Sequence, residues 1–403
     1  MEGIKVLVFY NQMLDSFLGS GGDIRCAQTI KRWRGLRVSV LGPSISRFLK
    51  EELGAEKYFS LPRNFLERLY QKLPSVFIIG PIYILRAFSS LKILKEQKCD
   101  LLYTTGDFIC NTFPAFWIKR KNSEAKWVAN IFHINLPPTK REKNKFLFAL
   151  GSFLLQRVSF FLLKRADLIF LLNNGVKKSL VKMGFNPEKL IVLGGGVDIT
   201  KIKRIKPKKP KRKNVIFLGR LNLTKGIFDL PKIWPLVLEK VPEARLILIG
   251  AGEEKIIKDL KEKFMSVGVL DSVEFRGFIQ KNEDVYKILK TGKVFILPSY
   301  EEGWGIVVFE AIACGLAPIT HNLPVFKEIF GENIQVVPIG NTIFFAKTIV
   351  KFLSNESLRR KYVFDLNKKI KRYDWDKIAN RELELIKRLQ AGNLVFKKGD
   401  GAA

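Results

Sequence analysis

Residues that bind transition metals through nitrogen or sulfur are scarce in this chain. It contains only two histidines, His133 and His321, and four cysteines that lie far apart and form no C-x-x-C pair. Structural zinc sites take closely spaced cysteines and histidines as ligands. The sequence therefore predicts no such zinc site, and isolated cysteines are typical of free thiols in a reducing cytosol.

A long hydrophobic run is also missing. Spanning a bilayer takes roughly 18 consecutive apolar residues, and no uninterrupted run approaches that length. The N-terminus, MEGIKVLVFY, has Glu2 where a signal peptide would have lysine or arginine, so we predict no secretory signal. The longest apolar segments are 76–88, which Arg86 interrupts, and 146–165, which lysines and arginines flank.

Segment 146–165 allows two interpretations. It reads FLFALGSFLLQRVSFFLLKR and is apolar over most of the circumference of a helix. One interpretation is a buried helix of the first domain. The other is an interfacial helix that lies among lipid headgroups, with its basic residues against anionic lipid.

Acidic residues are few relative to basic ones. The chain has 38 aspartates and glutamates against 70 lysines and arginines, which gives a formal net charge of +32. Such an excess favours polyanions, anionic lipid surfaces or phosphorylated substrates as partners, although a solvated lysine-rich surface would have the same composition. Residues 201–213, KIKRIKPKKPKRK, concentrate nine basic residues in thirteen positions. Because like charges and proline oppose helix and sheet, we predict a linker there.

Short apolar runs alternate with helix-length segments on both sides of this predicted linker. Residues 4–10, a glycine-rich loop at 19–25, a helical stretch and a strand-like run at 37–42 form the pattern of a first βαβ unit. A chain of 403 residues is long for one hydrophobic core. We predict an N-terminal α/β domain at 1–200, the linker at 201–213, a second α/β domain at 214–372 and a C-terminal helix and tail at 373–403, the helix returning to the first domain.

The stretch EEGWGIVVFEAIACG at 301–315 carries the most distinctive polar pattern. A strand-like run, VFILPS, precedes it, two glycines break the chain, and a helical segment follows. Ligands of open α/β sheets bind at the carboxyl ends of strands, and a helix N-terminus there favours phosphate. Glu302 and Glu310 flank this turn, and carboxylates accept hydrogen bonds from the paired hydroxyls of a sugar. The residues alone also allow a helix-start glutamate and a salt-bridged one.

The longer stretch LPSYEEGWGIVVFEAIACGLAPI resembles the signature of the family 4 glycosyltransferases of GT-B fold, in which seven residues separate two glutamates. Further stretches are similar to motifs of that family and occur in its order: SGGDIR, NIFHIN, RADLIFLLNN, GGGVD, FLGRLNLTKG, IGAGEE and YDWDKIA. The resemblance covers nearly the whole chain. It implies two Rossmann-like domains that face each other across a cleft, with the acceptor side N-terminal and the donor side C-terminal.

The resemblance also implies an activity and roles for named residues. The activity is retaining transfer of a sugar from a nucleotide-diphosphate-sugar donor to a hydroxyl. Donor-diphosphate contacts are implied for Arg220, Lys225, Gly21 and Gly22. Ribose contacts are implied for Glu310, and contacts to the transferred sugar for Glu302, Gly303, Trp304 and Gly305. His133 is implied at the donor sugar or the reacting centre, so the implied catalytic set is His133, Glu302, Arg220 and Lys225.

Two positions depart from the family pattern. Gly292-Lys293 replaces the usual alanine-aspartate, and Leu323-Pro324 replaces the usual glycine pair. These departures lie near the expected donor site, so they leave the base and the sugar open. We expect no cofactor and no metal, because two cationic side chains and a helix dipole already oppose the diphosphate charge.

The net charge and segment 146–165 extend the hypothesis to a partner and a location. We predict a cytoplasmic protein, peripherally bound at the inner face of an anionic membrane, with a lipid-linked or cell-surface glycan precursor as its acceptor. We do not predict nucleic-acid binding, since no recognised motif for it is present. Two alternatives remain open: a sugar-nucleotide epimerase of the same fold, and a non-catalytic basic protein that binds membranes or polyanions.

Overall fold

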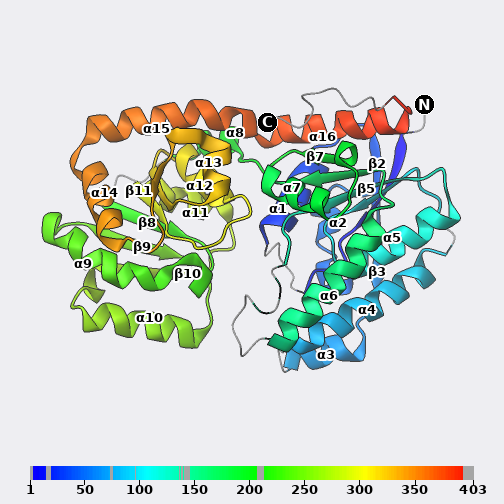
Figure 1. Ribbon diagram of the computed structural model, residues 1–403, viewed down its shortest axis with the longest axis horizontal. Helices are drawn as coiled ribbons and strands as arrows, with labels where there is room; N and C mark the ends of the chain where they lie inside the picture. Colours follow the sequence, from blue (N-terminus) through cyan, green and yellow to red (C-terminus); the bar gives the residue numbers. More distant parts are fainter. Residues whose placement is uncertain are drawn as a thin grey trace. The chain divides into compact units, whose positions relative to one another are not determined.

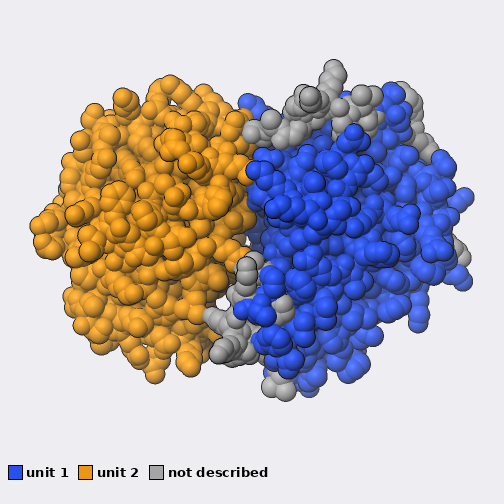
Figure 2. All heavy atoms as spheres, in the orientation of Figure 1, with its two compact units in different colours: residues 1–194, 375–403 blue, residues 195–374 orange. Residues whose placement is uncertain are grey.

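The computed structural model describes residues 3–14, 20–72, 76–95, 97–135, 137, 139, 146–206 and 213–393. The chain divides into two compact units (Figure 2). Unit 1 comprises residues 1–194 and 375–403, and unit 2 comprises residues 195–374. Each unit is built on one parallel sheet with helices around it (Figure 1), which confirms the predicted class of two Rossmann-like α/β domains.

The described part of unit 1 holds a seven-stranded sheet in the order β3-β2-β1-β4-β5-β6-β7. Its strands read as nearly continuous apolar runs, as expected where both faces of a parallel sheet are covered. Val6 and Val8 point into one core cluster, whereas Leu7 and Phe9 point into the other. The strand bounds are Ile4–Phe9 (β1), Leu36–Pro43 (β2), Lys57–Leu61 (β3), Leu101–Thr104 (β4), Lys126–Ile131 (β5), Leu168–Leu171 (β6) and Leu190–Val192 (β7).

Helices cover both faces of this sheet. The first cluster takes apolar residues of α1, α2 and α16, and the second takes those of α4, α5, α6 and α7. Together with α3 these helices span Gly21–Ile30 (α1), Leu49–Glu52 (α2), Phe65–Lys72 (α3), Val76–Ile93 (α4), Ile109–Lys121 (α5), Phe146–Leu163 (α6), Asn174–Lys182 (α7) and Trp375–Gln390 (α16).

In unit 2 the described residues form a six-stranded sheet in the order β10-β9-β8-β11-β12-β13. Its strands are Asn214–Leu218 (β8), Arg245–Ile249 (β9), Val273–Gly277 (β10), Gly292–Leu297 (β11), Ala317–His321 (β12) and Gln335–Val337 (β13). Its helices are Ile199–Arg204 (α8), Leu230–Lys240 (α9), Glu254–Ser266 (α10), Asn282–Leu289 (α11), Ile306–Ala313 (α12), Pro324–Phe330 (α13), Thr342–Ser354 (α14) and Glu356–Ile370 (α15).

The boundary between the units differs from the predicted one. Unit 2 begins at Gly195 and ends at Asp374, and the start of the predicted linker, 201–204, is the end of α8. The side chain of Asp198 caps this helix by accepting a hydrogen bond from the backbone of Lys201, and Ile199 and Ile202 are buried. A cap and two buried isoleucines stabilise the helix despite its charge. Residues 207–212 of the predicted linker lie outside the described residues.

Segment 146–165 forms α6, which has a buried face and an exposed face. Phe160 is 3% exposed and lies in the core, whereas its neighbour Phe161 is 73% exposed. The buried face agrees with the interpretation as a core helix of the first domain, whereas the interfacial interpretation stays a prediction. In the other apolar segment, Arg86 is buried in an ion pair with Glu67 of α3 at 3.0 Å. None of the helices in the described ranges combines the length and hydropathy needed to span a bilayer.

A buried ion pair attaches α16 to α1 in unit 1. Arg25 Nη2 lies 2.8 Å from Glu382 Oε2, and both side chains are almost inaccessible to solvent. The hydroxyl of Tyr103 donates to the other oxygen of Glu382 at 2.6 Å. Arg25 also donates to the side chain of Asn130 and to the carbonyl of Gly194. Each of the three nitrogen atoms of the buried guanidinium therefore donates to an acceptor.

Glu382→Ala should destabilise unit 1 severely, because it leaves the charge of Arg25 buried without a partner. We expect a loss of about 3 to 5 kcal/mol in the free energy of unfolding, measured by urea denaturation. Glu52→Ala is the matched control, since Glu52 pairs with Lys31 at the surface and such pairs contribute about 0 to 1 kcal/mol. Equal losses in the two variants would contradict the structural role of the buried pair.

Candidate functional site

The candidate site of unit 2 lies where the order of strands reverses. β8 and β11 are neighbours in the sheet, and the chain continues outward from them in opposite directions. At such a switch point the loops that follow the two strands diverge and leave a crevice. The loop after β8 carries Arg220 and Lys225, and the loop after β11 carries Glu302, Gly303, Trp304 and Gly305. The fold thus brings two motifs from distant parts of the sequence together.

Backbone contacts hold these two loops side by side. The backbone N–H of Tyr300 donates to the carbonyl of Thr224 at 2.9 Å. Gly226 adopts a left-handed conformation with φ of 68°, and a Cβ at this position would lie 1.8 Å from the carbonyl oxygen of Pro298. Only glycine permits both the conformation and the close approach. This explains why glycine follows Lys225.

Lys225 and Glu302 form an ion pair across the two loops. The Nζ of Lys225 lies 2.5 Å from Oε1 of Glu302, and the side chains are 17% and 8% exposed. The hydroxyl of Ser299 donates to the same oxygen at 3.0 Å. An anion that binds Lys225 must therefore compete with Glu302, and displacement of the lysine would leave the carboxylate free to accept other hydrogen bonds.

Arg220 is the cation of this site that has no carboxylate beside it. Its side chain is exposed, and within the described ranges it forms no ion pair and no side-chain hydrogen bond. The next residue is fixed, because the backbone N–H of Leu221 donates to Ala251 at 2.7 Å. The guanidinium thus stands on an anchored turn, with its planar set of donors available to a diphosphate.

Glu310 lies in α12 and is partly buried, and no cation of the described residues forms an ion pair with it. The hydroxyl of Tyr286 on α11 donates to Oε1 of Glu310 at 2.8 Å. Burial raises the pKa of Glu310 to about 7, although the Tyr286 hydrogen bond favours the charged form. The carboxyl group is thus poised between its two protonation states near neutral pH. Sequence reasoning missed Tyr286, because it occupies an ordinary buried position of a helix.

The loop before α12 combines a sharp turn with a buried tryptophan. Gly305 has φ of 77° and precedes the helix, and a Cβ there would lie 2.8 Å from the ring of Phe326. The indole of Trp304 stacks on Phe309 with centroids 5.5 Å apart, and it touches Gly195, where a Cβ would lie 2.8 Å away. The Trp304 side chain is buried and therefore belongs to the core of unit 2, although its Nε1 has no hydrogen-bond partner among the described residues.

In unit 1, Gly21 and Gly22 begin α1 after the carboxyl end of β1. The side chain of Ser20 caps the helix by accepting from Asp23, so the N-terminal backbone N–H groups sit beside the sheet edge. A Cβ at Gly22 would lie 2.4 Å from the ring of Phe132. Packing against Phe132 thus requires glycine at this position whether or not a ligand approaches.

His133 stands just after β5 and is exposed, next to a buried carboxyl group that the sequence analysis did not single out. Asp107 follows β4, the neighbouring strand. Its burial raises its pKa, and the charge of His133 opposes that rise. Gln156 of α6 donates to Asp107 at 2.6 Å and to the His133 carbonyl at 3.1 Å. The sequence did carry a signal for Asp107, since an aspartate that closely follows a buried strand is a candidate site residue.

The remaining positions noted from the sequence have structural explanations. His321 is buried, its Nδ1 lies 3.2 Å from the carbonyl of Ser299, and burial lowers its pKa. A Cβ at Gly292 would lie 2.7 Å from Ile216, so this departure from the family pattern serves packing. Pro324 begins α13. No group of three His, Cys, Asp or Glu side chains able to hold a metal occurs in the part of the chain that the structure describes.

Comparisons with known proteins agree with this geometry. The family described as "Glycosyl transferases group 1" matches residues 198–365. A phosphatidyl-myo-inositol mannosyltransferase of Mycobacterium leprae is 29% identical over 42% of this chain and 45% of its own length. A GDP-mannose:cellobiosyl-diphosphopolyprenol alpha-mannosyltransferase of Xanthomonas oryzae is 26% identical over 49% of this chain and 52% of its own. The match thus spans about half the length of these curated relatives.

The solved structures extend the likeness to both units. Anabaena HepE in complex with UDP and glucose has a TM-score of 0.71 at 17% identity, with 95% of this chain and 99% of that chain covered. A glycosyltransferase of Rickettsia africae has a TM-score of 0.73 at 15% identity, with 98% and 100% covered. At these identities the likeness shows the fold alone. The sequence match to the group 1 glycosyltransferases thus covers residues 198–365, which lie within unit 2, and the fold of the whole chain is similar to that of the solved glycosyltransferases.

Proposed function

We propose that this chain is a retaining hexosyltransferase that moves a sugar from a nucleotide-diphosphate donor to the hydroxyl of a lipid-linked acceptor. The observation that carries the proposal is the set of groups at the switch point of unit 2. Arg220 has no ion-pair partner among the described residues, Lys225 and Glu302 form an exchangeable pair, and Glu310 has a pKa of about 7. Together they provide cations for a diphosphate and carboxylates for sugar hydroxyls.

The donor's two phosphates would bind Arg220 and Lys225, next to the free N–H groups at the start of α12. Binding would take Lys225 from Glu302, whose carboxylate would then accept hydrogen bonds from the transferred sugar, with backbone N–H groups of Gly303, Trp304 and Gly305 beside it. Glu310 would accept from the ribose hydroxyls. As the diphosphate departs, its growing charge meets cations that are already in place, which stabilises the transition state.

Unit 1 would supply the groups at the reacting end of the donor. We assign His133 to the donor sugar, and the first turn of α1 at Gly21 and Gly22 to the diphosphate. Asp107 acts here as a positioning residue, because it is buried and lies beside His133. The proposal needs no metal, and full turnover after dialysis against EDTA is the expected result.

The names of relatives support the substrate class. The M. leprae protein is named a phosphatidyl-myo-inositol mannosyltransferase, and the X. oryzae protein transfers mannose from GDP-mannose to cellobiosyl-diphosphopolyprenol. HepE has been solved with UDP and with UDP-glucose. A lipid-linked acceptor is common to the two relatives, whereas the base differs between GDP and UDP. We therefore propose the acceptor class and leave the donor base to a screen of nucleotide-sugars.

An apolar face of unit 1 supports work at a membrane surface. Helices α3, α4 and α6 pack side by side (Figure 1), and α4 and α6 contain no aspartate or glutamate. We call their exposed apolar side chains the apolar face; they are Phe65, Leu69, Phe77, Ile84, Leu85, Phe88, Phe146, Leu147, Leu154, Val158 and Phe161. With a net charge of +32, such a face suits peripheral binding to anionic lipid at the cytoplasmic side.

Glu310→Gln should weaken donor binding and stabilise the free protein at alkaline pH. The raised pKa means that the folded chain retains a proton that the unfolded chain releases, so this group lowers stability as pH rises from 4.5 to about 7. Glutamine removes this pH-dependent loss of stability, which is on the order of 3 kcal/mol at pH 8. It also removes a ribose hydrogen bond to a charged acceptor, which contributes about 1.5 to 3 kcal/mol to binding. Nucleotide titration calorimetry and thermal melts at pH 5 and pH 8 measure both.

The control for Glu310→Gln is Glu332→Gln, an exposed position of unit 2. This control should change neither affinity nor the pH dependence of the melt. Unchanged nucleotide affinity in a folded Glu310→Gln protein would remove Glu310 from the donor site.

Arg220→Ala and Lys225→Ala should each lower kcat by about 10²- to 10³-fold, because each removes a charge whose effect grows as the leaving group departs. Lys255→Ala, on the exposed side of α10, is the control. Turnover is followed by release of nucleoside diphosphate with and without acceptor. Near wild-type rates in both variants would refute the assignment, and conversion of donor to an isomer without acceptor would favour an epimerase.

Substitutions of the neighbouring residues Phe160 and Phe161 test whether the apolar face binds anionic lipid. Phe161→Ser should reduce flotation with anionic liposomes and leave stability unchanged, because this ring is exposed. Phe160→Ser should keep binding wherever the protein is folded but cost about 3 to 5 kcal/mol of stability. Added salt should release the wild-type protein. Failure of the wild type to float at low salt would show that the apolar face does not bind lipid.

A further inference from the structure

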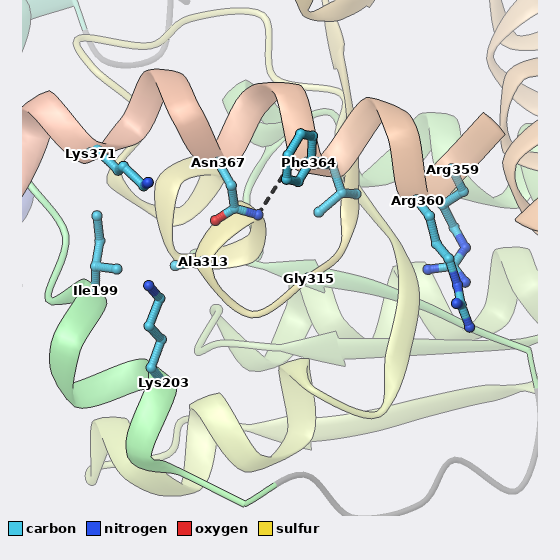
Figure 3. A pocket seen from close by; sticks show the side chains of 10 residues that line it. Ile199, Lys203, Ala313, Gly315, Arg359, Arg360, Phe364, Asn367 and Lys371 are labelled. Carbon is cyan, nitrogen blue, oxygen red and sulfur yellow. Dashed lines mark hydrogen bonds between the residues drawn. The ribbon is translucent and has the colours of Figure 1, made fainter. Parts of the chain in front are cut away.

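A second cationic site lies at the other end of helix α12 from the donor site. A cavity of about 390 Å³ is lined by residues of α8, the end of α12, α15 and the turn after α15 (Figure 3). It is closed on one side by Ala313 and Gly315, whereas the candidate donor loop meets α12 at Gly305. An eight-residue helix is about 12 Å long. The two sites therefore belong to the same unit but occupy different edges of its sheet.

The charge of this cavity has one sign. Among the described residues its lining includes Lys203, Lys371, Arg359 and Arg360 and no carboxylate. Arg360 is paired with Glu356, and Arg359 reaches the same carboxylate only at 4.0 Å. The Nε atom of Arg359 is buried and has no hydrogen-bond partner among the described residues. A buried donor without a partner is unfavourable, so one donor of this cavity still lacks an acceptor.

Two of these cations converge. Lys203 comes from α8 and Lys371 from the turn after α15, and their amino groups point toward one another across the cavity (Figure 3). Within the described ranges neither makes an ion pair or a side-chain hydrogen bond. Both lysines are exposed, so an anion from solution can reach them. At the end of α12, the carbonyl of Glu310 already accepts from Cys314, and that of Ile312 accepts from Gly315 and Asn367.

The wall of the cavity adds a second requirement for the ligand. Ile199, Val363 and Phe364 provide apolar surface along α15, and the side chain of Asn367 lies in the middle of the groove. The volume falls in the range of small-molecule sites, about 300 to 1,000 Å³. A phosphate between the lysines would thus leave room for an organic body that lies along α15 toward Arg359.

We propose that Lys203 and Lys371 form a phosphate-binding site for a small phosphorylated ligand, separate from the donor site. Convergent lysines on two elements bind phosphate as point charges, and the arginine end of the groove accommodates a second anionic group. The phosphate can belong to a soluble phosphomonoester or diphosphate, or to the headgroup of a lipid. The site does not depend on the proposed transfer reaction.

The probe is inorganic pyrophosphate, titrated calorimetrically into the full chain. Because the donor site also binds diphosphate in our proposal, the test uses Arg220→Ala/Lys225→Ala as the background. We expect pyrophosphate binding to persist there and to weaken at least tenfold when Lys203→Gln and Lys371→Gln are added. Lys255→Gln in the same background is the control. Turnover of Lys203→Gln/Lys371→Gln on an intact donor site reports separately on the transfer reaction.

A second arm distinguishes the source of the phosphate. Sedimentation with phosphatidylglycerol vesicles compares the wild type with Lys203→Gln/Lys371→Gln and with Lys255→Gln. If the double variant loses vesicle binding but still binds pyrophosphate, the site is assigned to a lipid headgroup. If it loses pyrophosphate binding but still binds vesicles, the site is assigned to a soluble ligand. Circular dichroism melts check the fold. Unchanged pyrophosphate and vesicle binding in a folded double variant would overturn the proposal.

Discussion

Unit 1 depends on one charge that has no access to water. Arg25 of α1 is bound by Glu382 of α16 and by the carbonyl of Gly194. Gly194 is the last residue before the chain enters unit 2, and α16 begins where the chain returns. Because a buried guanidinium without its carboxylate is strongly unfavourable, this pair fixes three distant segments to one another. The helix that begins with Gly21 and Gly22 thereby has a fixed position at the edge of the sheet.

The ion pair of the candidate site is of another kind. Lys225 and Glu302 are close together, but they stand on two loops at the carboxyl edge of the sheet, where a ligand can replace either partner. Arg25 and Glu382 fill the interior and leave no room for exchange. Charge thus has two uses in this molecule. Buried pairs in the interior specify how elements join, and pairs at loop ends hold charges ready for a substrate.

The basic residues of the chain differ in whether a carboxylate of the protein neutralises them. Some lysines and arginines form ion pairs with carboxylates, such as Lys201 with Glu283 and Lys213 with Glu243. Arg220 lies at the donor edge of unit 2, and Lys203 and Lys371 converge in the cavity beside α15. These are positions where a positive charge has no internal counter-ion in the described residues, so they are positions where an external anion would be stabilised.

The amino-acid sequence by itself determined the strands, their order of appearance and the loops that carry function. Apolar runs of strand length, glycines at turns and the glutamate pair at 302 and 310 are local patterns, and a parallel sheet places the ends of such strands at one edge. The basic segment 201–213 was misread at its start, because the burial of Ile199 and Ile202 is a property of the folded unit.

Only the tertiary structure decided which groups meet. Tyr286 beside Glu310, Asp107 beside His133, and Glu302 bound to Lys225 join residues that are 24 or more positions apart. It also decided that Phe160 is buried while Phe161 is exposed, and that Trp304 and Gly22 serve packing. The physical reason is that periodicity records which face of an element is apolar, whereas partners, pKa shifts and burial arise from neighbours that folding brings from elsewhere in the chain.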